Sequence, residues 1–238
     1  MVTQLKFGDI AVDVVLKDIK NVHLSVHPPT GRVRISAPKR LSLDTIRSFA
    51  VSKIGWIKQQ QKRLQGQERE TPREYLERES HYVWGRRYLL KILEEQTTPR
   101  VELTHNRMIL RVNPRASEAE REATIAHWYR EQIKAAVPDL ITKWEKFLGV
   151  DVDRVFVQKM KTKWGSCNPH NRSIRLNTDL AKKPRECLEY IVVHEMVHVL
   201  EPTHNASFVA LMDRHMPQWR ICRDQLNRLP VCHEEWAY

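Results

Sequence analysis

The sequence predicts an α+β fold in which a β-rich N-terminal subdomain, residues 1–115, precedes a helix-rich core, residues 116–238. In the first part, apolar and polar residues alternate over short runs that glycine, proline or asparagine residues separate. In the second part, apolar residues recur at helical spacing over longer stretches. The composition changes at Asn113-Pro114-Arg115, where we place the boundary between the two parts.

The alternation in the N-terminal part predicts short strands at 10–14, 22–26, 33–35, 101–103 and 108–112, and residues 83–92 predict two strands that are separated by a turn at Gly85. Helical spacing over 43–65, after the candidate N-cap Ser42, predicts one helix among these strands. We therefore expect one small, mostly antiparallel sheet with a helix across it. No internal repeat is evident.

Helical signals dominate the second part. Ser117 and Glu120 form a capping-box pair, and a helical stripe continues from there to residue 148. Pro138 interrupts this stripe and predicts either a kink or two abutting helices. The later signals predict strands at 154–158 and 173–177, a helix from Pro184 to about Leu200, a short helix after Asn205 and a last helix from Pro217.

The composition indicates a protein with a substantial core that does not enter a membrane. Of its 238 residues, 41% are apolar and 29% are charged. The longest apolar runs are too short to cross a bilayer, and residues 1–9 lack the apolar segment of a signal peptide. We therefore expect a cytoplasmic location, in which the four cysteines are reduced thiols.

The formal net charge of +11 and the pI of about 9.6 favour acidic partners. Such a partner would be nucleic acid, a nucleotide or an acidic protein surface, and a basic protein without a polyanionic partner is the alternative. No compact run of basic residues stands out, so the charge does not distinguish DNA, RNA and nucleotides.

The strongest functional signal is the run His194-Glu195-Met196-Val197-His198, which has the form H-E-x-x-H within an apolar segment. Positions i and i+4 share one face of a helix, so both imidazoles can bind one ion with Glu195 beside it. His204 follows six residues later, and three histidines with one water would complete a tetrahedral zinc site with an open position. The simpler alternative is that ordinary hydrogen bonds and an ion pair satisfy these buried polar groups.

Three motifs of the second part resemble those of the YgjP-like metallopeptidase family, a group of small bacterial zincins related to the WLM and SprT-like proteases. The motifs are Trp164-Gly165-Ser166-Cys167, Ile174-Arg175-Leu176-Asn177 and the run from His194 through His204 to Phe208. The resemblance covers most of the chain, although its specific part is C-terminal. It implies a zincin-like core in which the strand at 174–177 runs beside the active helix and holds an extended peptide.

The resemblance also implies that His194, His198 and His204 bind Zn²⁺ and that Glu195 is the general base. The spacing of the third histidine also occurs in metzincins. Those proteins carry a glycine where this chain has Glu201, and no clear Met-turn follows, so the chain does not fit that group.

The leading hypothesis is a zinc-dependent metallopeptidase that cleaves peptide or protein substrates with an activated water. A metal-dependent phosphoanhydride hydrolase acting on nucleotides, such as a nucleoside triphosphate pyrophosphatase, is the second, because an activated water also attacks phosphorus. Against it, the chain has no glycine-rich phosphate loop and no second cluster of carboxylates. The third is a nucleic-acid-associated protein with a structural zinc, which would normally have four protein ligands.

Weaker candidates surround the motif. Glu201 is a rival third ligand, but it is only three residues from His198, and Pro202 is expected to break the helix there. Lys163 or Arg175 could donate a hydrogen bond to a transition-state oxyanion. The remaining candidates are interpreted as packing, turn or solvated residues: Trp164, Cys167, His170, Asp213 and His215.

Overall fold

The computed structural model describes residues 2–27, 30–65, 73–160 and 163–228. Both helices and strands are present, so the fold is α+β as predicted. The chain separates into two compact units, whose described parts are residues 2–65 and residues 73–228. Each unit has its own hydrophobic core.

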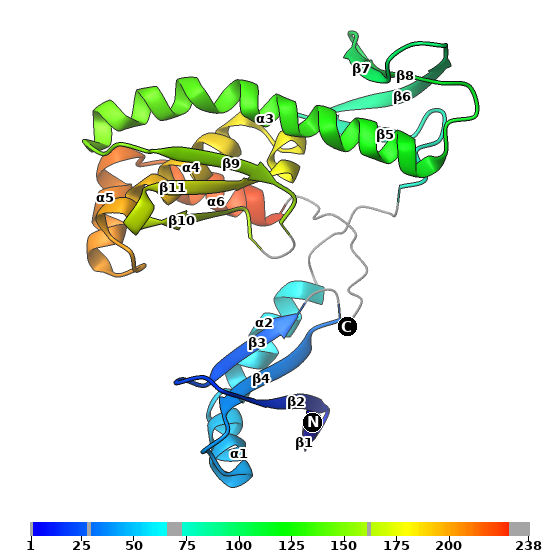
Figure 1. The fold of residues 1–238 in the computed structure, drawn as a ribbon. Coiled ribbons are helices and arrows are strands. Elements are labelled where there is room, and N and C mark those ends of the chain that lie inside the picture. Colours follow the sequence, from blue (N-terminus) through cyan, green and yellow to red (C-terminus); the bar gives the residue numbers. More distant parts are fainter. Residues whose placement is uncertain (1, 28–29, 66–72, 161–162, 229–238) are drawn as a thin grey trace. The chain divides into compact units, whose positions relative to one another are not determined.

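The first unit contains a four-stranded sheet (Figure 1). Its strands are β1 (Val2–Phe7), β2 (Ile10–Lys17), β3 (His23–His27) and β4 (Arg32–Pro38), in the spatial order β1-β2-β4-β3. β1 pairs with β2 and β3 with β4 in antiparallel fashion, whereas β2 and β4 are parallel. The prediction of a mostly antiparallel sheet therefore missed the central pair, because the alternation of side chains does not reveal strand direction.

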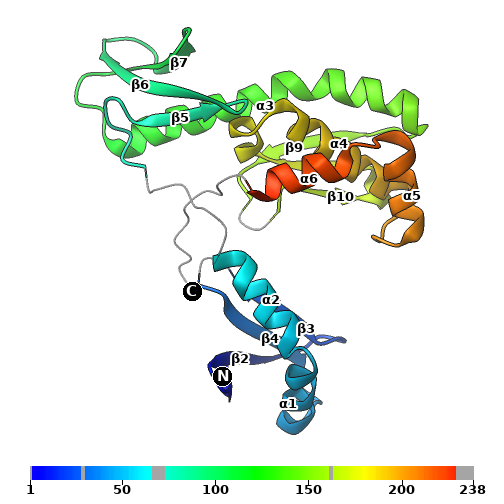
Figure 2. The ribbon, with the colours of Figure 1, turned by 180° about the vertical axis from the view of Figure 1, so that it is seen from behind.

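Two helices, α1 (Leu43–Ser52) and α2 (Ile54–Gln65), cover one face of this sheet (Figures 1 and 2). Ser42 caps α1 as predicted, since its hydroxyl accepts the backbone N–H of Thr45. The helical segment is interrupted at Lys53, so the single predicted helix is in fact two. Their buried residues Ile46, Ala50 and Ile57 pack against the apolar face of the strands.

The second unit begins with another four-stranded sheet, which has the topology of the first. Its strands are β5 (Ser80–Val83), β6 (Arg86–Glu94), β7 (Arg100–Leu103) and β8 (Arg107–Val112), in the order β5-β6-β8-β7 with β6 parallel to β8. A serine-capped helix follows this sheet as it follows the first. The N-terminal half thus contains a structural repeat, which the sequence does not show because the outward-facing side chains of the two sheets differ.

The long helix α3 (Glu118–Leu148) links the second sheet to the rest of its unit (Figure 1). Ser117 and Glu120 form the predicted capping box. Pro138 lies inside the helix, so the predicted alternative of two abutting helices is wrong. Pro138 is exposed, and the carbonyl that loses its partner can be hydrated, while Val137 and Trp144 hold the helix on the core.

A third sheet has the order β10-β11-β9 and is made by β9 (Arg154–Gln158), β10 (Gly165–Asn168) and β11 (Ser173–Asn177). The short helical turns η1 (Pro169–Asn171) and η2 (Thr178–Lys182) follow β10 and β11. The chain then forms α4 (Arg185–Leu200), α5 (Ala206–His215) and α6 (Trp219–Arg228), and α4 and α6 cover one face of this sheet (Figure 2). Of these elements, β9, β11 and the three helices were predicted, although the last helix begins at Trp219 and not at Pro217.

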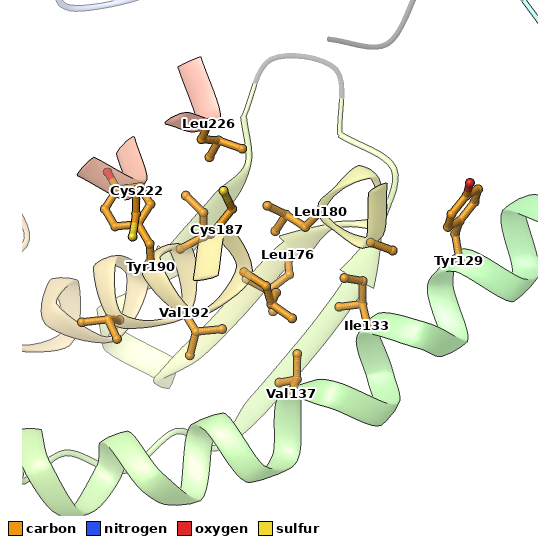
Figure 3. Packing of buried hydrophobic residues seen from close by; sticks show 14 of the residues in the cluster. Tyr129, Ile133, Val137, Leu176, Leu180, Cys187, Tyr190, Val192, Cys222 and Leu226 are labelled. Atoms are coloured by element: carbon orange, nitrogen blue, oxygen red, sulfur yellow. The ribbon is translucent and has the colours of Figure 1, made fainter. Parts of the chain in front are cut away.

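Helix α4 is packed on two sides, in agreement with the prediction of a buried helix. In Figure 3, residues of α3 including Ile133 and Val137 point toward Val192 of α4 and Leu176 of β11. On the other side of α4, Cys187 and Tyr190 face Cys222 and Leu226 of α6.

The second sheet belongs to the same unit as the C-terminal core. The backbone N–H of Trp84 donates to the carbonyl of Ala181 at 2.8 Å, and the Tyr129 hydroxyl donates to the carbonyl of Tyr82 at 2.8 Å. Gly85 has a φ of +78°, and a Cβ there would lie 2.9 Å from Pro184, which precedes α4. The units therefore divide near residue 70, whereas the change of composition at residues 113–115 predicts a boundary at 115.

No helix in the described ranges has both the length and the apolar character needed to cross a bilayer. The described cysteines, Cys167, Cys187 and Cys222, are free thiols, and Cys232 lies outside the described residues. Burial raises the pKa of Cys187 to about 11, so this side chain stays protonated at neutral pH.

Candidate metal centre

Helix α4 carries two of the three histidines. It packs against α3, α5, α6 and β10, so the core determines its orientation. His194 and His198 are one turn apart, both partly buried, and their ring centroids are 4.9 Å apart. The helix ends at Leu200, and Glu201 continues with an extended backbone.

The turn after α4 brings His204 back to the helix. Its Nε2 lies 3.0 Å from Nε2 of His194 and 3.1 Å from Nε2 of His198. Asn205 caps α5 by accepting the backbone N–H of Phe208 at 3.0 Å, so His204 stands directly before a well-defined helix start. The structure thus brings the three predicted histidines together, and their ligand atoms could hold a metal ion.

Neighbouring groups orient the three rings. Nδ1 of His198 lies 3.0 Å from the carbonyl oxygen of Glu201, and a ring N–H that donates there leaves the Nε2 lone pair directed at the cluster. Phe208 of α5 is 2% exposed, and its ring centroid lies between 4.7 and 5.0 Å from those of all three imidazoles. The rings are therefore held by packing as well as by hydrogen bonding.

The donor set fits a tetrahedral cation. Zn–N bonds of about 2.0–2.1 Å place nitrogen ligands about 3.3 Å apart, close to the spacing of these Nε2 atoms. Burial, together with the neighbouring His198 and His204, lowers the pKa of His194 to about 3. The ring is therefore neutral at physiological pH, which is the state that binds a metal.

The carboxylate of Glu201, the rival third ligand, is hydrogen-bonded within the turn, and it is the backbone carbonyl of this residue that contacts His198. Its Oε1 accepts the hydroxyl of Thr203 at 3.0 Å and the backbone N–H of Thr203 at 3.3 Å. These bonds and one from the Asn205 side chain lower the pKa of the carboxyl group. Glu201 thus stabilises the turn that carries His204.

Glu195 is buried beside the histidines, with 5% of its surface exposed. Its carboxylate accepts the backbone N–H of Cys167 on β10. Burial raises the pKa of Glu195 to about 7, although Lys163 and the Cys167 N–H both favour the charged form. A carboxyl group that titrates near neutral pH can both accept and return a proton.

Gly165 makes room for this carboxylate. A Cβ atom at position 165 would lie 2.6 Å from Oε1 of Glu195 and 2.9 Å from Cγ2 of Ile191, both on α4. Only glycine allows β10 to approach the helix this closely, which explains the glycine of the Trp164-Gly165-Ser166-Cys167 motif. A glycine inside a predicted strand is a general signal of close approach, and it could have drawn attention to this residue in the sequence.

Replacing Gly165 by Ala should lower kcat/KM about 10- to 100-fold, because overpacking by one methyl group costs about 1–3 kcal/mol and displaces the Glu195 carboxylate. The measurement is peptide hydrolysis by the metal-loaded variant, with its metal content as a check on the site. Gly55→Ala is the matched control, since a Cβ at Gly55 meets nothing within 4 Å. Unchanged hydrolysis by the Gly165 variant would show that this spacing does not position Glu195.

One pocket joins the three histidines and Glu195 to β10 and the turn after it. The other lining residues are Lys163, Trp164, Gly165, Ser166, Cys167, Pro169, Ile191 and Pro202. Within the described parts of the chain, β10 pairs only with β11, so β10 is an edge strand. β11 lies between β10 and β9 and is hydrogen-bonded on both sides. The expectation that residues 174–177 hold a peptide is therefore wrong, and the available edge belongs to β10.

Asn177 holds the segment that leads into β10, a role the sequence analysis missed. The side chain is 4% exposed, and its amide donates to the carbonyls of Met160 at 2.8 Å and Lys163 at 2.9 Å. Its Oδ1 accepts the backbone N–H of Asp179 at 3.1 Å. These bonds place Lys163 and Trp164 at the pocket.

The structure separates the weaker candidates. Lys163 lines the pocket, whereas the Arg175 guanidinium lies 5.5 Å from the Phe156 ring centroid and is not among the lining residues. Trp164 also lines the pocket, so its interpretation as a packing residue is incomplete. Asp213 accepts Nε1 of Trp219 at 2.7 Å and pairs with Arg220, which joins α5 to α6.

An α+β core with these three histidines on and after a buried helix is of the metallopeptidase type. The family described as YgjP-like, metallopeptidase domain, matches residues 20–229. The chain belongs to this YgjP-like metallopeptidase family, as the motifs had indicated.

Two solved structures are similar over 40% of this chain. One is the metallopeptidase zymogen abylysin of Pyrococcus abyssi, with 22% identity, a TM-score of 0.36 and 99% of that chain covered. The other is the metallopeptidase zymogen jannalysin of Methanocaldococcus jannaschii, with 19% identity, a TM-score of 0.32 and 86% covered. The comparison with curated proteins gives no match.

Proposed function

We propose that this protein is a zinc-dependent peptidase that hydrolyses peptide bonds of extended polypeptides. The observation that carries the proposal is the convergence of three histidine Nε2 atoms in the pocket that also contains the buried carboxylate of Glu195. The membership of the chain in a metallopeptidase family supports the same conclusion.

In this proposal His194, His198 and His204 are the metal ligands. When bound, zinc would supply Lewis acidity and lower the pKa of the attacking water. Three protein ligands leave a coordination position open, which is typical of a catalytic site and not of a structural one. The carbonyl of Glu201 and the ring of Phe208 keep the imidazoles in place.

Glu195 is the proposed general base. It takes a proton from the attacking water and returns it to the leaving amine nitrogen. The Cys167 N–H fixes the carboxylate from one side, and Gly165 leaves the space that it occupies. Among the described residues that line the pocket, Lys163 is the one with a cationic side chain. We propose that it helps to stabilise the oxyanion that forms when water attacks the peptide carbonyl.

The edge of β10 is the proposed peptide-binding element. An extended peptide can add to a free strand edge through main-chain hydrogen bonds, and the side chains of Trp164, Pro169 and Pro202 offer it apolar contacts. A nucleoside triphosphate would require several cationic groups, whereas Lys163 is the single lysine or arginine found among the described lining residues. A peptide substrate is therefore favoured over a nucleotide.

The test is hydrolysis of an unfolded, fluorescently labelled protein by the purified full-length chain, with zinc content measured in parallel. A chelator should abolish cleavage, and adding zinc should restore it. The same preparation is assayed for phosphate or pyrophosphate release from nucleoside triphosphates. Metal-dependent nucleotide hydrolysis without peptide cleavage would refute the proposed peptidase and favour the phosphoanhydride hydrolase.

A further inference from the structure

Most of the net positive charge lies in residues 1–65, which contain the described part of the first unit. Residues 1–65 contain 12 Lys and Arg residues against 4 Asp residues and no Glu, so they account for +8 of the net +11. The rest of the chain is nearly balanced, although it contains the candidate metal centre. The net positive charge is therefore concentrated in residues 1–65, which do not contain the histidine cluster.

One face of the sheet in this unit is free of its helices. Alternate residues of the strands, such as Val12, Val14, Val33 and Ile35, pack in the core on the side of α1 and α2. The intervening residues lie on the opposite face, which we call the basic face. The basic face comprises Gln4, Lys6, Ala11, Asp13, Val15, Lys17, His23, Ser25, His27, Arg32, Arg34 and Ser36.

The single carboxylate on the basic face, Asp13, is already neutralised. It pairs with Nε of Arg32 at 2.5 Å and accepts the amide of Gln4 at 3.2 Å. Burial opposes its ionisation, but these two hydrogen bonds outweigh that effect and lower the pKa of the carboxyl group. The carboxylate therefore fixes the Arg32 side chain. No other acidic residue is present among the described residues of the basic face to neutralise the charges of Lys6, Lys17 and Arg34.

Planar and hydroxyl groups stand beside these cations. His27 and Arg32 are cross-strand partners, as are Ser25 and Arg34 and also His23 and Ser36. Burial and the neighbouring Arg34 and Arg32 lower the pKa of His27, so its ring is neutral near pH 7. A neutral imidazole ring beside guanidinium groups is a surface on which nucleobases can stack.

The second sheet shows that this composition does not follow from the topology. Its corresponding outward positions include Tyr82 and Leu89, which are 40% and 36% exposed, together with Leu93 and Ile109. Its Arg111 already contacts both Glu95 and Glu102. The outward positions of the second sheet also include cations, such as Arg87, Lys91 and Arg107, so the two sheets do not differ in the number of their cations. They differ in the residues beside those cations, which are histidine and serine in the first sheet and mainly large apolar residues in the second.

We infer that the basic face binds single-stranded nucleic acid. The unpaired positive charge is complementary to phosphates, and the histidine and arginine planes suit exposed bases. A duplex is a poor fit, because the described residues of this face belong to strands and the two described helices of the unit lie on the opposite face, where they cannot enter a groove. This inference is independent of the proposed peptidase activity, since the two features lie in different units.

The test uses the full-length chain and fluorescein-labelled 20-nucleotide RNA and DNA of mixed sequence, with the corresponding duplex as comparison. Binding is measured by anisotropy between 50 and 300 mM salt. The triple variant Lys6→Gln, Lys17→Gln, Arg34→Gln removes three phosphate contacts and keeps the Arg32–Asp13 pair. It should weaken binding at 0.1 M salt about 100-fold and reduce the slope of log K against log salt by about 2.

The matched control removes the same charge from the helical side of the unit, with Arg47→Gln, Lys58→Gln and Lys62→Gln. It should change affinity less than 3-fold, and both triple variants should show the thermal unfolding of the wild type. An equal loss of affinity in the two variants would refute a site on the basic face. Preference for the duplex, or equal binding to vesicles with 30% anionic lipid, would refute single-stranded nucleic acid as the ligand. If both single-stranded probes bind, their affinities show whether RNA or DNA is favoured.

Discussion

Replacing Glu195 by Gln is expected to lower kcat by about 10²- to 10⁴-fold while leaving the bound zinc in place. Gln preserves the size of the side chain and can still accept the Cys167 N–H. It cannot take up the proton of the attacking water, because its amide is not basic at neutral pH. Since Glu195 is not one of the proposed ligands, the metal content measured by mass spectrometry should equal that of the wild type.

Glu186→Gln is the matched control for this prediction. Glu186 lies on the same helix, is exposed and is not among the pocket-lining residues, so its neutral variant should cleave like the wild type. If the Glu195 variant retains full activity on the same substrate, the general-base assignment is wrong. If the Glu195 variant loses zinc together with activity, Glu195 is needed for metal binding, and the loss of activity is no evidence for a role in proton transfer.

Replacing His204 by Ala is expected to reduce zinc affinity by more than about 100-fold and to abolish hydrolysis at limiting zinc. Changes that only affect the orientation of a ligand cost about 10- to 100-fold in affinity, and this substitution removes a proposed ligand altogether. His204 is exposed and precedes α5, so the fold should remain intact. The measurement is zinc competition against a chromogenic chelator.

Two further variants serve as controls for the His204→Ala measurement. His105→Ala, in the exposed turn between β7 and β8, should keep the zinc affinity of the wild type. Glu201→Gln tests the rival ligand, and it should retain zinc within about 10-fold because the carboxylate contacts Thr203 and Asn205. Loss of zinc from the Glu201 variant, with zinc retained by the His204 variant, would exchange the two assignments.

The sequence was sufficient to predict the elements that depend on local interactions. The serine caps at Ser42 and Ser117, the long helical stripe and the buried H-E-x-x-H helix all depend on interactions within a few residues of the chain. Local spacing also brought His194 and His198 to one face. The pairing of strands was harder, because alternation reports which face is buried but not which strand is adjacent or how it runs.

For this reason the two mixed four-stranded sheets, and the repeat they form, were not predicted. The parallel pairs β2–β4 and β6–β8 join strands that are not adjacent in the chain. The same limit applies to β10 and β11. Among the described strands, only the pairing of β11 with the distant β9 shows that β10 has the free edge.

The sequence by itself determined the α+β class, the family and the chemical groups of the site. Motifs are local patterns, and His194, Glu195, His198 and His204 lie within eleven consecutive residues. The tertiary structure alone decided that Glu195 sits against Gly165, that Asn177 holds Lys163, and that Lys6, Lys17 and Arg34 share one sheet face. Each of these depends on segments far apart in the chain that packing brings together, and residue spacing does not encode such contacts directly.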